Sequence, residues 1–149
     1  MDPETFCLAQ NIYFEARNES TAGQIAVGQV TFNRVNSKRF PNNVCDVVYQ
    51  GPKYESWNTR KDKTLSNYER VYYPVKNKCQ FSWYCDGKAD DILNAKKFSE
   101  IYMLAVEISR RIIPDITDGA THYHADYVSP EWANHLQKTL TIDTHIFYK

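Results

Sequence analysis

The sequence predicts an α+β fold in which helices form the core and a small antiparallel sheet flanks them. Residues 7–18, 21–36 and 94–113 place apolar side chains at the spacing of a helix. The segments after residue 119 instead alternate polar and apolar side chains, which is the period of a β-strand. A chain of 149 residues has the size of one domain, so we expect a single domain over 1–149.

Charge and composition limit the classes of partner. The chain has 18 basic and 18 acidic residues, so we expect neither nucleic acid nor a membrane surface as partner. No stretch is long and apolar enough for membrane insertion, and the N-terminus lacks the pattern of a signal peptide. Asp2-Pro3-Glu4 suggests a trimmed start. Eleven tyrosines and three tryptophans suit a groove that stacks on sugar rings, although simple packing explains most of them equally well.

The four cysteines form no C-x-x-C pair and have no zinc spacing; they are Cys7, Cys45, Cys79 and Cys85. Two interpretations stay open. In an oxidising compartment one or two disulfides would form, with Cys45–Cys79 as the preferred pair, whereas in the cytosol the thiols would be free and buried.

Residues 7–18 contain no proline or glycine and are predicted to form the first helix. Leu8, Ile12 and Glu15 follow the spacing i, i+4, i+7, so Glu15 is expected to face the core. Burial would raise the pKa of this carboxyl group toward the range that a general acid needs. Two alternative interpretations stay open: a buried ion pair with Arg17 or another cation, or a partly exposed position at the rim of the core.

The second helix is predicted to start at Thr21, because Thr21 and Gln24 have the spacing of a capping box. It has two apolar stripes, and Gly28 between them would let a neighbouring helix approach closely. Its polar residues then need partners, and one of them could hold Glu15: Gln29, Asn33 and Arg34.

After a short helix predicted over 44–50, the periodic pattern is lost between residues 51 and 78. This segment has seven basic and three acidic residues and is rich in aromatic ones: Tyr54, Trp57, Tyr68, Tyr72 and Tyr73. We expect an insertion or lid loop that suits an anionic polymer, with a merely solvated insertion as the alternative.

Residues 79–84 alternate like a short strand, which would place Gln80 and Ser82 on one face and Phe81 and Trp83 in the core. The helix over 94–113 is the clearest in the chain, and Pro114 follows its end. Its apolar stripe consists of Phe98, Ile101, Ala105, Ile108 and Ile112.

Asp118-Gly119 predicts a turn into a strand over 120–127. Period-two spacing would place His122, His124 and Asp126 on one face of this strand, and Tyr123 and Tyr127 on the other.

Trp132 is expected in a short helical turn after Pro130. Leu140, Ile142 and Ile146 alternate along a predicted C-terminal strand.

Five stretches contain specific motifs. They are 11–17 (Asn-Ile-Tyr-Phe-Glu-Ala-Arg), 23–27, 33–35 with 39–41, 44–50 with 79–83, and 119–128 with Trp132-Ala133 and 145–148. In this order they resemble the cell-wall hydrolase family typified by the spore cortex-lytic enzyme (the SleB type). The resemblance implies a fold similar to lytic transglycosylases and goose-type lysozymes. It also implies cleavage of the β-1,4 bond between N-acetylmuramic acid and N-acetylglucosamine, without cofactor or metal. The family's catalytic acid maps onto Glu15.

Two mechanisms fit a glycosidase with Glu15 as acid. A hydrolase normally adds a second carboxylate, and Asp126 is the only other one inside a matching motif. A lytic transglycosylase instead lets the C6 hydroxyl of the substrate attack, and this reaction, which forms 1,6-anhydromuramyl ends, is the favoured one. The expected substrate-binding residues are Gln80, Ser82, Tyr123, His124, Asp126, Tyr49 and Trp132; ordinary edge polarity or packing is the alternative for Gln80, Ser82, Tyr49 and Trp132.

Two other classes stay open. A zinc amidase would need three ligands, such as His122, His124 and either His145 or Cys85, but the spacing is a weak signal. A non-catalytic wall-binding module would bind glycan without turnover. In the favoured reading the partner is the peptidoglycan glycan strand and the protein is a monomer. It acts at the bacterial cell wall, either as a phage lysin or as a domain of a longer secreted enzyme.

Overall fold

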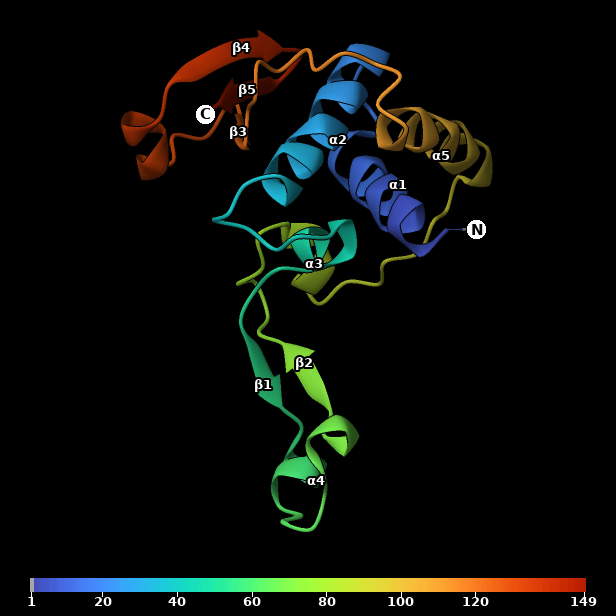
Figure 1. Ribbon diagram of the computed structural model, residues 1–149, viewed down its shortest axis with the longest axis vertical. Helices are drawn as coiled ribbons and strands as arrows, with labels where there is room; N and C mark the ends of the chain where they lie inside the picture. Colours follow the sequence, from blue (N-terminus) through green and yellow to red (C-terminus); the bar gives the residue numbers. More distant parts are fainter. Residues whose placement is uncertain (1) are drawn as a thin grey trace. The chain divides into compact units, whose positions relative to one another are not determined.

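The structure is a computed structural model that describes residues 2–149, and it divides into two compact units (Figure 1). One unit contains the chain up to Val48 and from Ile92 onward, and the other contains Tyr49–Asp91. Within residues 2–149, no helix has both the length and the apolar composition that a membrane span needs.

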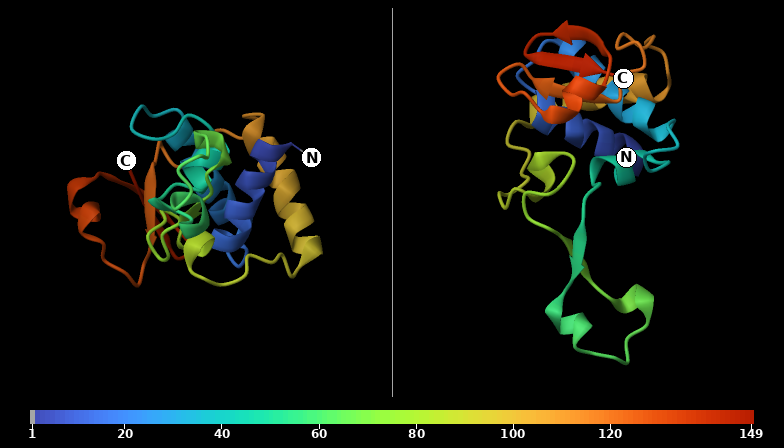
Figure 2. Two further views of the ribbon diagram at one scale, coloured as in Figure 1. Left: turned by 90° about the horizontal axis from the view of Figure 1, so that it is seen from below. Right: turned by 90° about the vertical axis from the view of Figure 1, so that its left-hand side faces the viewer.

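The first unit is built in layers around two long helices, α1 (Pro3–Ala16) and α2 (Thr21–Val35). The helix α5 (Ala95–Ser109) packs on one side of them, and a three-stranded sheet lies on the other, as the left view of Figure 2 shows. The short helix α3 (Val44–Val48) packs against both α1 and α2. The α+β architecture predicted from the sequence is confirmed.

Helix α1 begins four residues before the predicted start. Asp2 is the N-cap, and its carboxylate accepts hydrogen bonds from the Thr5 amide (2.9 Å) and the Thr5 hydroxyl (2.8 Å). Pro3 follows at the first helical position, where its missing N–H is not needed. The first turn of α1 is therefore stabilised by a side-chain cap.

Helix α2 begins at Thr21, but its N-cap is Ser20, whose hydroxyl accepts from the Gly23 amide at 3.1 Å. The predicted capping box of Thr21 and Gln24 is therefore wrong by one residue. The side-chain Nε2 of Gln24 instead donates to the Ala16 carbonyl at the end of α1 (3.3 Å). This bond ties the end of one helix to the start of the next.

Helix α2 crosses its neighbours at Gly28. A Cβ atom at this position would lie 2.8 Å from Ile108 Cδ1 of α5 and 3.0 Å from Ile12 Cδ1 of α1. The expected close approach is confirmed, because only the absence of a side chain leaves room for both isoleucines.

Helix α5 ends earlier than predicted. Its buried face contains four of the five predicted residues: Phe98, Ile101, Ala105 and Ile108. The fifth, Ile112, is 63% exposed, so its assignment to the core is wrong. The chain leaves the helix at Arg111, which has a left-handed φ of 56°, before the helical period reaches Ile112.

The sheet has the order β3-β5-β4 and is antiparallel throughout, with β3 (His122–Ala125), β4 (Lys138–Ile142) and β5 (His145–Tyr148). The single predicted C-terminal strand is wrong, because the chain reverses at Asp143 (φ 50°) and forms a hairpin. Strand β3 ends at Ala125, so the predicted face alternation does not extend to Asp126 and Tyr127.

All four cysteines form disulfides, Cys7–Cys45 and Cys79–Cys85. The predicted pair Cys45–Cys79 is wrong. Helix α3 docks on α1 because the Glu4 carboxylate of α1 accepts hydrogen bonds from the Val44 amide (3.0 Å) and the Cys45 amide (2.9 Å). This contact between distant segments brings Cys45 close to Cys7. The spacing of the cysteines in the sequence does not predict this contact.

The second unit contains a hairpin of β1 (Lys53–Glu55) and β2 (Tyr72–Pro74), which pair in antiparallel register. Between the strands lie α4 (Trp57–Arg60) and a 3-10 helix, Asn67–Glu69. The segment 51–78, whose sequence has no clear period, therefore has short regular elements.

The predicted strand over 79–84 is wrong, because residues Ser82–Cys85 form a 3-10 helix inside the loop that the Cys79–Cys85 disulfide closes. The predicted burial is nevertheless right. Phe81 and Trp83 are buried, and Gln80 and Ser82 are exposed.

Candidate active site

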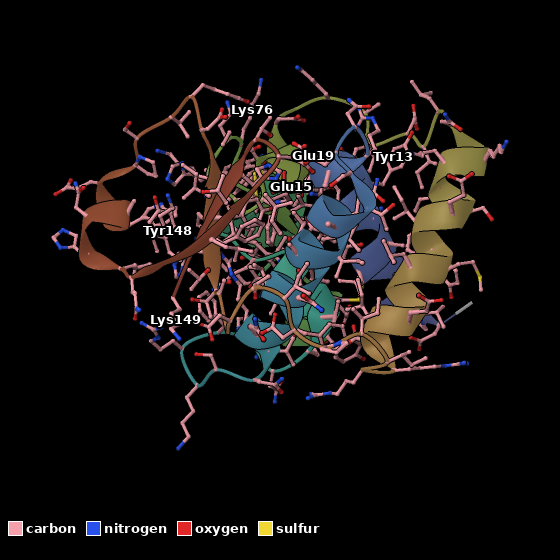
Figure 3. All side chains as sticks on the ribbon, turned by 90° about the horizontal axis from the view of Figure 1, so that it is seen from above. Tyr13, Glu15, Glu19, Lys76, Tyr148 and Lys149 are labelled. Carbon is pink, nitrogen blue, oxygen red and sulfur yellow. A yellow bond between two sulfur atoms is a disulfide. The ribbon has the colours of Figure 1, made fainter. Side chains whose placement is uncertain are left out.

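Glu15 lies in the last turn of α1 and points towards the sheet. Figure 3 shows Glu15 on the sheet side of the helices and Tyr13 on the side of α5. Leu8 and Ile12, on the same stripe of the helix, are fully buried. The helical period therefore carries Glu15 to the end of the buried stripe, where the residue stays partly accessible to solvent.

The partner of Glu15 is Tyr123 of β3. The Tyr123 hydroxyl donates a short hydrogen bond to Glu15 Oε1. The ring of Tyr123 packs against Phe147 of β5, with centroids 5.6 Å apart. Because Phe147 is fully buried, the hydroxyl is held by a rigid wall of the sheet and not by a loop.

Arg34 of α2 is the cation whose charge acts on Glu15. Its Nε donates to the Thr121 carbonyl at 2.7 Å, and its guanidinium lies 4.8 Å from the centre of the Phe40 ring. Among the three polar residues of α2 that the sequence offers as partners, Arg34 is the one whose charge acts on Glu15. Gln29 bonds to the Pro114 carbonyl instead, and Asn33 bonds to the Ala120 carbonyl.

The electrostatic surroundings favour a protonated Glu15. Burial raises the pKa of the Glu15 carboxyl group above its ordinary value, although the Tyr123 hydrogen bond and the charge of Arg34 act in the opposite direction. Burial and the neighbouring Glu15 raise the pKa of Tyr123 well above its ordinary value. Tyr123 therefore stays a donor, and Glu15 can carry a proton at a higher pH than a solvated glutamate.

A second carboxylate, Glu19, lies beyond the end of α1 and is also labelled in Figure 3. It accepts a hydrogen bond from the Thr144 hydroxyl and lies 3.9 Å from Nδ1 of His145. The buried His145 ring is 5.0 Å from the ring of Tyr123, so this group borders the Glu15 pair. Sequence reasoning misses Glu19 and Thr144. These two residues are far apart in the chain, and they meet only because the β4–β5 turn packs near the end of α1.

The predicted binding residue His124 is engaged within the sheet. Its Nδ1 bonds to the Ala125 carbonyl at 2.7 Å, and its Nε2 to the Tyr148 hydroxyl at 2.9 Å. Since the carbonyl can only accept, Nδ1 carries a proton, and in the neutral ring Tyr148 donates to Nε2. Asp126 is exposed just past β3, and its backbone amide donates to the Thr144 carbonyl at 2.7 Å.

Trp132 lies in the 3-10 helix Glu131–His135, as predicted, and packs on the sheet. Its ring is 5.0 Å from that of His122 and 5.4 Å from that of Tyr148. Burial and the cations Arg34 and Arg39 lower the pKa of His122 to about 4. This edge of the sheet is therefore an aromatic cluster with a neutral histidine.

The other predicted binding residues belong to the second unit. Tyr49 stacks on Tyr84 with ring centroids 4.5 Å apart, and burial raises its pKa. The Gln80 amide donates to the Gln50 carbonyl at 2.9 Å, and both Gln80 and Ser82 are exposed. Their role in binding stays a prediction.

The donors of a zinc site are committed elsewhere. Cys85 is in a disulfide, and both ring nitrogens of His124 have hydrogen-bond partners. Within residues 2–149, Glu4, Cys7 and Cys45 form a cluster of metal-ligand types. However, the two cysteines are oxidised and Glu4 caps α3, so these residues have no free donor set for a metal ion.

The fold is shared with two solved catalytic domains. The catalytic domain of the germination-specific lytic transglycosylase SleB from Bacillus anthracis aligns with a TM-score of 0.64 and 23% identity, over 100% of this chain and 97% of that one. The catalytic domain of the Bacillus cereus SleB protein aligns with a TM-score of 0.59 and 22% identity, over 98% and 89%. At these identities the likeness establishes a lysozyme-like fold, as expected from the sequence.

The model of the cell wall hydrolase family matches residues 18–148. The chain therefore belongs to this family. The match starts three residues after Glu15, so the role of Glu15 depends on its own geometry.

Curated relatives match over a shorter part. The spore cortex-lytic enzyme of Halalkalibacterium halodurans is 45% identical over 49 residues, which is 33% of this chain and 15% of that protein. The spore cortex-lytic enzyme of Bacillus subtilis is 49% identical over 43 residues, 29% of this chain and 14% of that protein. Each match thus spans about one seventh of the relative's length.

Proposed function

We propose that this chain cleaves the glycan strand of peptidoglycan between N-acetylmuramic acid and N-acetylglucosamine, as a lytic transglycosylase with Glu15 as its acid. The observation that carries the proposal is the contact of a desolvated, partly accessible Glu15 with the Tyr123 hydroxyl. The family and the likeness to the catalytic domain of a SleB lytic transglycosylase support the class of reaction. The place of action would be the bacterial cell wall.

In the proposed reaction, Glu15 donates its proton to the oxygen that bridges the two sugars. The bond between this oxygen and the muramic C1 breaks, and C1 becomes oxocarbenium-like. The C6 hydroxyl of the same sugar then attacks C1 and returns its proton to the Glu15 carboxylate. The products are a 1,6-anhydromuramyl end and a free 4-hydroxyl, so no water is consumed and no second carboxylate is needed.

Tyr123 would hold Glu15 in the orientation that this proton transfer needs. Its donor hydrogen bond occupies Oε1, so the proton of the neutral acid lies on Oε2. Arg34 would stabilise the carboxylate that forms after the proton has left. These roles use residues from α1, α2 and β3, which pack in one unit.

A hydrolytic muramidase is the second candidate, because other carboxylates lie near the pair. Glu19 is held by Thr144 beside His145, and the exposed Asp126 contacts the same turn through its amide. Either carboxylate could activate water. The products separate the two reactions, since water attack leaves a reducing muramic end.

The test is mass spectrometry of the soluble products from purified peptidoglycan. We expect anhydromuramyl ends from the unchanged chain and a loss of at least about a hundredfold in rate for Glu15→Gln, since the amide has no proton to transfer. Glu107→Gln, which changes an exposed glutamate of α5, is the matched control. Retention of more than about a tenth of the rate in Glu15→Gln would contradict the assignment.

Asp126→Asn and Glu19→Gln test the second candidate in the same assay. A modest loss is expected from each if the C6 hydroxyl is the nucleophile. Reducing ends together with a collapse comparable to that of Glu15→Gln would identify a hydrolase and its base.

A further inference from the structure

The hairpin segment, residues 51–78 of the second unit, exposes an unusual number of large aromatic side chains. The exposed fractions are 53% for Tyr54, 64% for Trp57, 90% for Tyr68, 54% for Tyr72 and 49% for Tyr73. No residue of this segment is buried. Exposed apolar side chains that gather in one patch mark an interaction site, whereas singly scattered ones do not.

These rings are not what holds the segment together. A polar centre at Arg70 does so: its Nη1 donates to Glu55 Oε2 (2.9 Å) and to the Thr59 carbonyl (3.0 Å), and its Nη2 to the Leu65 carbonyl (3.1 Å). The aromatic rings are not part of this polar centre, and each remains about half exposed or more.

Two of the rings form a platform on one face of the hairpin. Tyr54 and Tyr73 are directly opposite each other in the strand register, and their ring centroids are 6.0 Å apart. Trp57 follows β1 in the chain, and the guanidinium of Arg60 lies 5.2 Å from the centre of its ring. Flat rings combined with a cation suit a ligand with both apolar faces and negative groups.

The charge of the hairpin segment points the same way. It contains seven basic and three acidic residues, a formal charge of +4, whereas the rest of the chain contains eleven basic and fifteen acidic residues, a formal charge of −4. The three acids are engaged locally: Glu55 with Arg70, Asp62 with Thr64, and Glu69 with Ser66. The lysines are exposed and have no carboxylate partner among residues 2–149: Lys53, Lys61, Lys63, Lys76 and Lys78.

We propose that the hairpin segment is a second contact surface for the peptidoglycan strand, outside the Glu15 site; this rests on the proposed function. The sugar rings would stack on Trp57 and on the Tyr54–Tyr73 platform. The lysines would attract the free carboxylates of the peptide stems and of any muramic acid that carries no peptide. The attraction offsets the repulsion between an anionic wall and the acidic remainder of the chain.

Charge and shape favour this polymer over a nucleic acid. A nucleic acid carries a charge on every nucleotide, and its binding depends on the release of many counterions. The chain as a whole has no net charge, and its single basic segment is short. A glycan strand with carboxylates at intervals needs fewer cations for binding than a nucleic acid does, and it offers flat sugar faces to aromatic rings.

The experiment measures co-sedimentation with purified sacculi that have been stripped of accessory polymers, in a Glu15→Gln background so that the wall is not consumed. One variant combines Trp57→Ala with Tyr73→Ala, and another combines Lys61→Gln with Lys63→Gln. The matched controls are Ile112→Ala, an exposed apolar side chain, and Lys96→Gln, an exposed lysine, both in the first unit.

We expect the aromatic variant to bind about tenfold more weakly, as is usual for truncated Trp and Tyr anchors. The lysine variant should bind more weakly at low salt and show a flatter dependence on NaCl. The controls should bind like the parent. If the double aromatic variant fails to fold, Trp57→Ala alone replaces it, since this ring belongs to the proposed contact surface and is 64% exposed.

In the active chain, the aromatic variant should lose turnover of intact sacculi and keep its rate on short soluble glycan fragments. Unchanged sedimentation of both hairpin variants overturns the inference, and so does tighter binding to single-stranded DNA than to sacculi. If the parent chain cleaves no glycan but sediments through the hairpin segment, the proposed function fails and the inference stands.

Discussion

The two units of this protein are stabilised in different ways. In the first unit, side chains from α1, α2 and the sheet are fully buried, among them Leu8, Val27 and Phe147. In the second unit, the buried side chains are Phe81, Trp83 and Cys85, all in the loop closed by a disulfide, and the hairpin segment has none.

This difference shows how the chain divides its tasks. Tyr123 reaches Glu15 because its ring is fixed against a dense core, which sets the position of the hydroxyl. The hairpin segment relies on Arg70 and leaves its rings in solvent. Substitutions in the first unit should therefore often lower the stability of the fold. Substitutions of the exposed rings in the second unit should leave stability nearly unchanged and weaken the binding of the ligand.

The largest difference is expected from removing one aromatic ring in each unit. Phe147→Ala should lower the free energy of unfolding by about 3–5 kcal/mol, because a fully buried ring leaves a cavity. Tyr68→Ala should change it by less than about 0.5 kcal/mol. Urea unfolding followed by circular dichroism measures both. A loss above about 2 kcal/mol in Tyr68→Ala would show that this exposed ring helps to hold the hairpin segment together.

The two disulfides give a smaller contrast. Cys7–Cys45 closes a separation of 38 residues and Cys79–Cys85 one of 6, so the chain-entropy model assigns them about 4 and about 2 kcal/mol. Replacing Cys7 and Cys45 by serine should lower global stability in denaturant. Replacing Cys79 and Cys85 should raise hydrogen exchange within the second unit only. Equal effects on both units would show that the units unfold as one.

The smallest effect concerns the pH dependence of activity. Tyr123→Phe removes a hydrogen bond that lowers the pKa of Glu15, so this pKa should rise further. Activity requires protonated Glu15, so the alkaline limb of the pH–rate profile should move to higher pH, with a loss of about tenfold in rate from weaker positioning.

Tyr148→Phe is the control for this change, since the Tyr148 hydroxyl bonds to His124 in the same sheet and not to Glu15. An alkaline limb that stays in place in Tyr123→Phe would show that another group controls the profile.

Much of the helical unit could be predicted from local patterns. The spacing of Leu8, Ile12 and Glu15 correctly predicts the buried stripe of α1, and Gly28 correctly predicts a close helix crossing. The exposed Ile112 shows the limit of such patterns, because the helical period does not indicate the residue at which a helix ends.

The pairings between distant segments could not be predicted in this way. The disulfide Cys7–Cys45 depends on the docking of α3 through Glu4, and Glu19 meets Thr144 only where the β4–β5 hairpin turns. Such contacts depend on strand register and helix packing. Local sequence patterns determine neither of these, so they do not show which distant residues meet.

The sequence by itself determined that Glu15 faces inward and that the chain combines helices with a small sheet, because both follow from the period of side chains along one element. Only the tertiary structure decided that Tyr123 donates to Glu15, that Arg34 is its cation, and that the hairpin rings remain in solvent. These features arise when elements far apart in the chain pack together, and the burial that results sets the pKa of Glu15.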